Sequence, residues 1–352
     1  MTPTRIRVSV FNIEEKKDMK KGMINGLLKI RTGICALLAV AAAGCDSALE
    51  TETDTDGEEA VLLQFGLYKG GGATRADGTE TTEDMSAGKY IRIYAFPAGT
   101  TDFKAPLGDA VYKVEAGGTA TGPLKLYRGS YDIYLLSYNS EASYPKTDDE
   151  GKVTVENNHD FMCTKLTNVV VQPEAGKNMM EVQLPEPFKR MGSQVITTVS
   201  VKDNTPVKPS GLTVTSITIG GLRHELVYRL NSSAWEVPAD KANDNSVAFS
   251  GFTGSGLDSK PPAVSPAKVL LPVDGTLTFD VAMTITYTES DNTEKTIYPV
   301  YKASLLKALL PGMTYKFDFT LTFYGEIKPV DLTLAVTDWN RIPLEAEDMG
   351  KE

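Results

Sequence analysis

Apolar and polar residues alternate along several stretches of the chain, and a period of two predicts β-strands with one buried face. The longest stretch covers residues 277–287, and shorter ones cover residues 315–323 and 332–336. The apolar positions of these stretches are Leu277, Phe279, Val281, Met283, Ile285 and Tyr287, then Tyr315, Phe317, Phe319, Leu321 and Phe323, then Leu332, Leu334 and Val336.

The apolar parity changes between residues 212–214 and residues 217–219, which predicts a β-bulge near Thr215. Clusters of Gly, Pro, Asn and Asp separate the strand-like runs, as is typical of β-sandwiches. Helical patterning is scarce. Only residues 303–312 could form one or two short helical turns, ended by a Pro-Gly pair.

These patterns indicate an all-β protein with two parts. The segment LPEPFKRMG, residues 184–192, has a proline on either side of Glu186, and prolines interrupt strands and stiffen connections. We therefore predict one β-sandwich over residues 60–185 and a second over residues 191–345.

The N-terminus has the features of an export signal. A basic segment precedes an apolar run at residues 34–44, ICALLAVAAAG, which is too short to span a bilayer. The junction with Cys45 resembles the lipobox of bacterial lipoproteins, with Ala42 where Leu is usual. The resemblance implies that a signal peptide, residues 1–44, is removed and that Cys45 is lipidated. We expect several acyl chains, because one binds membranes only marginally. The alternative is a buried helix with an incidental cysteine.

Residues 45–59 are expected to form an acidic tether. Seven acidic and no basic residues occupy positions 46–59, and like charges with little apolar content favour a solvated segment. The stretch loosely resembles the acidic signals that direct some Bacteroidetes lipoproteins to the outer leaflet. A generic solvated linker is the alternative.

Charge and cysteine content narrow the class of protein. The chain has 36 Lys and Arg and 46 Asp and Glu, and 8 and 3 of these lie in residues 1–44. The remaining 28 basic and 43 acidic residues give a net charge of −15, which argues against nucleic acid as a partner. After Cys45 only Cys163 follows, so an intrachain disulfide framework is excluded. We expect Cys163 to be a small buried residue.

Motifs for chemistry are lacking, so we expect no enzyme activity, no cofactor and no metal. His159 and His224 have no ligand-like neighbours, and His224 is expected at a surface or turn. Glycines 70–72 lack the Lys and the strand-to-helix context of a phosphate loop and are interpreted as flexible. Carboxylates alone leave a glycoside hydrolase open. The Tyr-rich segment 127–138 could hold a sugar, although cross-strand packing is the commoner role of such tyrosines.

The order of the motifs resembles the fimbrillin superfamily of Bacteroidetes, the subunits of type V pili and their relatives. The lipobox and a strand-like run are followed by TRA at 74–76 and KYIRIYAF at 89–96. Residues 123–139 are similar to the segment before the family's mid-domain loop. Residues 309–323 and 332–340 resemble its C-terminal signature. The resemblance implies two tandem β-sandwich domains of the transthyretin-like type.

The resemblance also implies a maturation step. In the family, an Arg-specific protease cuts after an arginine behind the first strand, and a strand from a neighbouring subunit fills the vacated groove. Arg75, flanked by small residues, fits this role. An uncut loop is the alternative. The inward side chains of the released strand would be Val61, Leu63, Phe65 and Leu67.

The implied role is a structural or tip/accessory subunit of a cell-surface fimbrium, held at the outer membrane by its lipid before maturation. Its expected partners are other pilin subunits and the Arg-specific protease. Only about a dozen residues follow Trp339, and they are rich in charge, so the run with Leu332, Leu334 and Val336 is the candidate donor strand. A tip position that donates nothing is the alternative. The alternative function is a surface-anchored glycan-binding lipoprotein.

Overall fold

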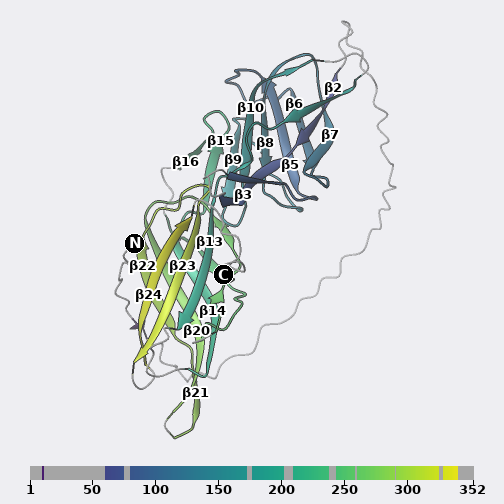
Figure 1. Cartoon of the computed structure of the whole chain (residues 1–352). Helices are drawn as coiled ribbons and strands as arrows, with labels where there is room; N and C mark the ends of the chain where they lie inside the picture. Colours follow the sequence, from purple (N-terminus) through teal and green to yellow (C-terminus); the bar gives the residue numbers. More distant parts are fainter. Residues whose placement is uncertain are drawn as a thin grey trace, which may run out of the picture. The chain divides into compact units, whose positions relative to one another are not determined.

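The computed structural model describes residues 10–11, 60–74, 80–172, 177–201, 209–237, 243–257, 260–289, 291–324 and 328–339. These residues form 24 strands and no helix, so the predicted all-β class is confirmed (Figure 1). Accordingly, no described segment is a helix capable of crossing a membrane. Cys45, Arg75 and the predicted acidic tether lie outside the described residues.

Residues 61–190 supply the strands of two sheets and one hairpin. These strands are β2 (Val61–Gly66), β3 (Tyr68–Thr74), β4 (Glu80–Asp84), β5 (Tyr90–Pro97), β6 (Gly108–Lys113), β7 (Thr119–Leu126), β8 (Gly129–Ser137), β10 (Met162–Val171), β11 (Met179–Gln183) and β12 (Lys189–Arg190). One sheet is antiparallel, in the order β12-β10-β8-β5-β6, and the other has the order β11-β2-β7. Strands β3 and β4 pair with each other as a hairpin.

Residues 193–339 supply two larger sheets. Their strands are β13 (Ser193–Val201), β14 (Gly211–Leu222), β17 (Asn245–Phe249), β18 (Ala263–Val264), β19 (Lys268–Leu270), β20 (Thr276–Thr288), β21 (Glu294–Ile297), β22 (Val300–Leu306), β23 (Thr314–Tyr324) and β24 (Lys328–Trp339). One sheet has the order β22-β20-β14-β17, with β21 beside β20 and the two-residue β1 (Val10–Phe11) beside β22. The other has the order β18-β13-β23-β24, with β19 also on β13.

A small third sheet joins strands from both halves of the chain. It consists of β9 (Lys152–Glu156), β15 (Glu225–Arg229) and β16 (Ala234–Glu236), in the order β16-β15-β9 (Figure 1). Strands β9 and β15 run antiparallel over five residue pairs, from Glu156 opposite Glu225 to Lys152 opposite Arg229. Main-chain hydrogen bonds therefore connect two segments about 70 residues apart in sequence.

Buried apolar side chains form three clusters. The first draws only on residues 61–188 and the second only on residues 195–334. The third, called the junction core here, draws on both halves and centres on Phe161. The Phe161 ring lies 5.2 Å from that of Tyr228 and 5.8 Å from that of Trp235, measured between centroids. The predicted two-domain boundaries stay a prediction, since the described residues after Glu59 form one compact unit.

One local prediction is confirmed and one needs correction. The strand register of β14 against β20 shifts between Val214 and Ser216, which is the predicted bulge. Residues 303–306 are strand, not helix, because pairing of β22 with β20 buries alternate side chains and overrides the helix preference of Leu, Lys and Ala. Glycines 70–72 lie in β3, where the pairing with β4 is irregular between Gly70 and Thr74.

The junction core should contribute strongly to stability. Replacing the fully buried Phe161 by Ala should lower the free energy of unfolding by about 3–5 kcal/mol, because it leaves a cavity that the surrounding rings cannot fill. Tyr127, which is 45% exposed, gives a matched aromatic control whose change to Ala should cost little. Guanidinium unfolding curves measure both, and coinciding midpoints for the two variants would contradict the importance of this core.

Candidate functional site: the groove of the first strand

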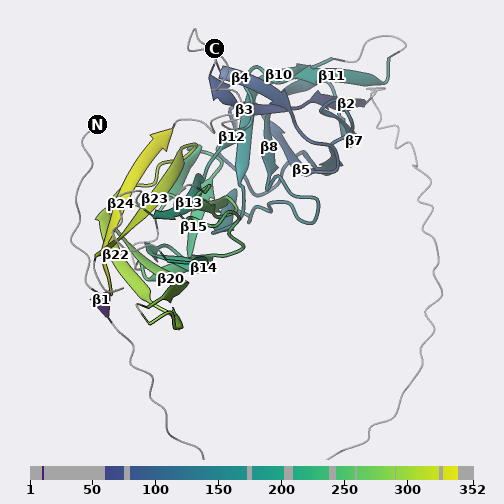
Figure 2. The same ribbon diagram turned by 60° about the horizontal axis from the view of Figure 1, so that its bottom comes forward.

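Strand β2 lies in a slot between β11 and β7, and both of its backbone edges are paired (Figure 2). Its pairing with β11 is parallel and its pairing with β7 is antiparallel. Beyond the strand, the Leu67 N–H donates to the Gly118 carbonyl at 2.7 Å and the Leu67 carbonyl accepts from the Met85 N–H at 3.2 Å. Removing this segment would therefore leave unpaired main-chain groups on both sides of the slot.

The inner face of β2 is fully enclosed. Alternate side chains point into the first apolar cluster, and none of them is more than 2% exposed. Burying each side chain of this size contributes about 1.5–3 kcal/mol, so the strand is held too firmly to leave without a competitor. These side chains are Val61, Leu63, Phe65 and Leu67.

Tyr112, on β6, reaches the backbone of β2 from inside the core. Its hydroxyl donates a hydrogen bond to the Leu63 carbonyl at 3.0 Å, and its ring meets the Phe65 ring edge-on at 5.7 Å. Burial raises the pKa of the Tyr112 hydroxyl to about 12, although a hydrogen bond from the Leu124 N–H opposes the rise. The phenol therefore stays neutral and remains a donor throughout the physiological pH range.

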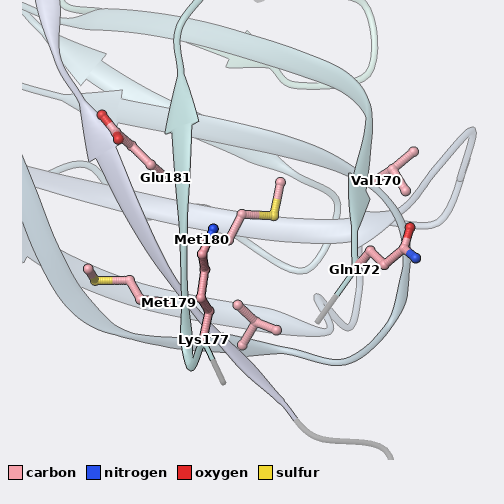
Figure 3. Close-up of a pocket in the computed structure, with 7 residues that line it drawn as sticks. Val170, Gln172, Lys177, Met179, Met180 and Glu181 are labelled. Atoms are coloured by element: carbon pink, nitrogen blue, oxygen red, sulfur yellow. The ribbon is translucent and has the colours of Figure 1, made fainter. Parts of the chain in front are cut away.

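A pocket of about 340 Å³ opens where β2 begins (Figure 3). Figure 3 shows Met179 and Met180 on β11, with Lys177 just before the strand begins. Val170 and Gln172 project from the end of β10. Val170 is 55% exposed and Met179 is 43% exposed. Apolar side chains beside the beginning of the slot are thus partly open to solvent. The lining residues are Val61, Val170, Gln172, Lys177, Met179, Met180 and Glu181.

The hairpin of β3 and β4 lies between β2 and the rest of the body in the sequence. Its ladder runs from Tyr68 opposite Asp84 to Thr74 opposite Glu80. Arg75 belongs to the connection between these strands, outside the described residues. A cut after Arg75 would leave β3 on the same fragment as β2. Sequence reasoning missed β3, because its glycines carry no strand signal.

The candidate donor strand, β24, lies at the edge of its sheet. It pairs with β23 from Thr314 opposite Trp339 to Tyr324 opposite Lys328, and its other edge has no ladder partner among the described strands. Leu334 is buried, and Val336 packs against the second cluster. The side chain of Leu332 lies outside the described residues. Whether this strand is donated stays a prediction.

The titratable residues singled out in the sequence do not come together. Within the described ranges, no group of three or more His, Cys, Asp or Glu could hold a metal ion. His224 lies at the surface, with Nε2 3.1 Å from the Asp244 carboxylate, as predicted for a surface or turn residue. His159 stacks on Tyr138 with 4.7 Å between ring centroids. These positions form no arrangement for acid–base or metal chemistry.

Cys163 is buried in the junction core, as predicted. Its thiol donates a hydrogen bond to the Tyr228 hydroxyl at 3.1 Å. Burial raises the pKa of the thiol to about 11, with small opposing effects from Tyr228 and Lys189. The thiol is therefore protonated at neutral pH and is a poor nucleophile.

The Tyr-rich segment serves packing. Tyr131 and Tyr134 are buried, and the Tyr138 ring stacks on His159 and meets Phe161. Among the tyrosines of this segment, only Tyr127 is exposed, at 45%. The cross-strand packing interpretation is confirmed, and the sugar platform considered for this segment is reduced to a single side chain.

Comparison with known proteins identifies the family. A search of curated protein sequences finds no match. Among solved structures, a fimbrial protein from Bacteroides vulgatus aligns with a TM-score of 0.52 at 12% identity, covering 81% of this chain and 99% of that chain. A candidate cell adhesion protein from Bacteroides fragilis gives 0.49 at 17% identity, covering 82% and 99%. The tip fimbrial protein Mfa3 from Porphyromonas gingivalis gives 0.38 at 10% identity, covering 80% and 100%.

The match to a family model is decisive, because it extends over most of the chain. The model of the fimbrillin-like family matches residues 74–339, which include β4 to β24 and leave out β1, β2 and most of β3. The resemblance drawn from the sequence motifs is thereby confirmed. This chain belongs to the fimbrillin-like family.

Proposed function

We propose that this protein is a structural or tip/accessory subunit of a cell-surface fimbrium, exported as a lipoprotein and assembled by strand exchange. The observation that carries the proposal is the slot of β2, which is paired on both edges and filled from one face by four side chains. Family membership supports a fimbrial role, as does the fimbrial protein of Bacteroides vulgatus among the similar structures.

An empty slot would accept only one kind of occupant. Strands β11 and β7 would each expose a row of unpaired N–H and C=O groups, with an apolar channel between them. Only an extended strand with alternating apolar side chains satisfies both the backbone and the channel, which is the basis of strand donation. The pocket beside Val61 gives such a strand an accessible end at which to begin.

Cleavage after Arg75 would make the exchange feasible. In the uncut chain, β2 remains tethered through β3, and a tethered strand competes at high effective concentration against any strand from another molecule. After the cut, β2 and β3 would belong to a separate fragment, held by Cys45 to the outer membrane. That fragment can dissociate, and the body is then free to join other subunits at the cell surface.

Donation of β24 would exchange one set of contacts for a similar one. Leaving its own sheet would cost the ladder with β23 and the burial of Leu334 in the second cluster. The slot of a neighbouring molecule offers two backbone edges in place of one. If the subunit occupies a tip position, β24 would stay in place, and only the slot would take part in assembly.

Changing Arg75 to Ala should keep the protein uncut, monomeric and lipidated, because the protease has no other basic target between Lys69 and Lys89. The exposed Arg128, outside this connection, provides the control: Arg128→Ala should still be cut and should still assemble. Gel filtration and SDS-resistant laddering after treatment with an Arg-specific protease measure assembly. A clickable fatty acid reports the lipid, which should be absent from Cys45→Ala.

If wild-type protein is cut after Arg75 and yet forms no multimer at any concentration, with or without partner pilins, strand exchange is wrong. The anchored glycan-binding function would then be the better account. Equal fatty acid labelling of wild type and Cys45→Ala would separately contradict lipidation at that residue.

A synthetic peptide of residues 328–339 should enter the slot of the cut protein and suppress laddering. The same peptide carrying Leu334→Asp should be inactive, because a carboxylate without a partner is strongly disfavoured in an apolar channel. A scrambled peptide controls for composition. Should a peptide of residues 60–75 suppress laddering while the 328–339 peptide does not, the donor strand lies elsewhere in the assembly.

A further inference from the structure

We propose that Tyr112 anchors whichever strand occupies the slot by donating a hydrogen bond to one of its main-chain carbonyls, at the position that Leu63 holds in β2. The inference rests on the proposed strand exchange for the incoming strand, but its first part concerns β2 itself. It makes Tyr112 a positioning residue that acts on backbone rather than on side chains. Strands of different sequence can therefore be held at the same depth.

The need for this anchor arises in β7. Leu62 pairs with Lys125 and Gln64 pairs with Thr121, so three residues of β7 face Leu63 alone. The middle one is Pro123, which has no N–H to donate. The ladder is therefore incomplete opposite Leu63, and the Tyr112 hydroxyl supplies the missing donor at 3.0 Å.

The slot itself, and not β2 alone, holds Tyr112 in place. The ring lies against Gly122 of β7, where an added Cβ would come within 2.7 Å of the ring carbons. Tyr112 is 1% exposed and is carried by β6, on the body side of the predicted cut. These contacts would persist when β2 leaves, so the hydroxyl would stay in position to donate to a carbonyl of the incoming strand.

The hydrogen bond from Tyr112 also opposes a shift of the strand along the slot. The Leu62 N–H points to the β11 side, where it donates to Asn178, and the Leu67 N–H points to the β7 side, where it donates to Gly118. Main-chain groups thus alternate between the two sides along β2. A slip of one residue would turn the carbonyl at Tyr112 toward β11. The hydroxyl therefore disfavours shifts by an odd number of residues. The fit of the side chains in the channel disfavours shifts by an even number.

Hydrogen exchange on the intact, uncut chain tests the anchor for β2. Tyr112→Phe removes only the hydroxyl, so the amides of β2 should exchange about tenfold faster than in wild type. Tyr301→Phe is the matched control. That tyrosine is also buried, but in the second cluster, and its hydroxyl has no hydrogen-bond partner among the described residues. Unchanged protection of β2 in Tyr112→Phe would overturn the inference, whether or not strands are exchanged.

Peptide binding to the cut protein tests the anchor for an incoming strand. The probe is a peptide of residues 60–75 whose amide between Leu63 and Gln64 is replaced by an ester, because an ester carbonyl is a weaker acceptor. This replacement should weaken binding to wild type by about tenfold more than binding to Tyr112→Phe. An ester between Phe65 and Gly66 should weaken binding to both proteins equally.

The outcomes separate the two claims. Equal weakening of both proteins by the first ester overturns the role of Tyr112 toward incoming strands. If no peptide enters the slot of any variant, the proposed strand exchange fails, and the role toward incoming strands fails with it. Hydrogen exchange then still decides whether Tyr112 anchors β2 in the intact protein.

Discussion

A strand that is paired on both edges and buried on one face can be replaced only by another strand. This constraint follows from the cost of leaving main-chain N–H and C=O groups unpaired in an apolar setting. In this protein it applies to β2, whose neighbours β11 and β7 have no other way to complete their ladders on that side. The functional interpretation of the pocket, the hairpin and Tyr112 depends on this one occupied slot.

The second half of the body contains a strand whose edges are paired differently from those of β2. There β24 pairs with β23 on one edge, and its other edge has no ladder partner among the described strands. Its loss would open one row of main-chain groups, those of β23. The described part of the chain thus contains a strand paired on both edges, β2, and a strand paired on a single edge, β24, and the proposed exchange would use both.

The parts of the fold that repeat with a local period were predictable from sequence. Strands β20, β23 and β24 follow their alternating side chains, and the bulge beside Thr215 follows a change of parity. Residues 303–306 were mispredicted because Leu, Lys and Ala favour helix locally, whereas pairing with β20 decides the outcome. Strand β3 could not be predicted for the opposite reason, because glycines 70–72 carry no strand-forming side chains.

The site was predictable only in outline. The four apolar positions of the first strand could be identified from their spacing, but the role of Tyr112 depends on a proline in another strand and a glycine beside it. The junction core likewise assembles Phe161, Tyr228 and Trp235 from distant parts of the chain. Contacts of this kind have no local sequence signal, so only the tertiary structure reveals them.

The parallel pairing of β2 with β11 has a consequence for folding. Strand β2 is the first strand of this half of the body, yet its partner β11 follows more than 100 residues later. Contacts between such distant segments form late, because a long loop must be closed first. The slot is therefore one of the last places in this half of the body to be filled. A folding chain passes through a stage in which β2 has still to be placed between β11 and β7.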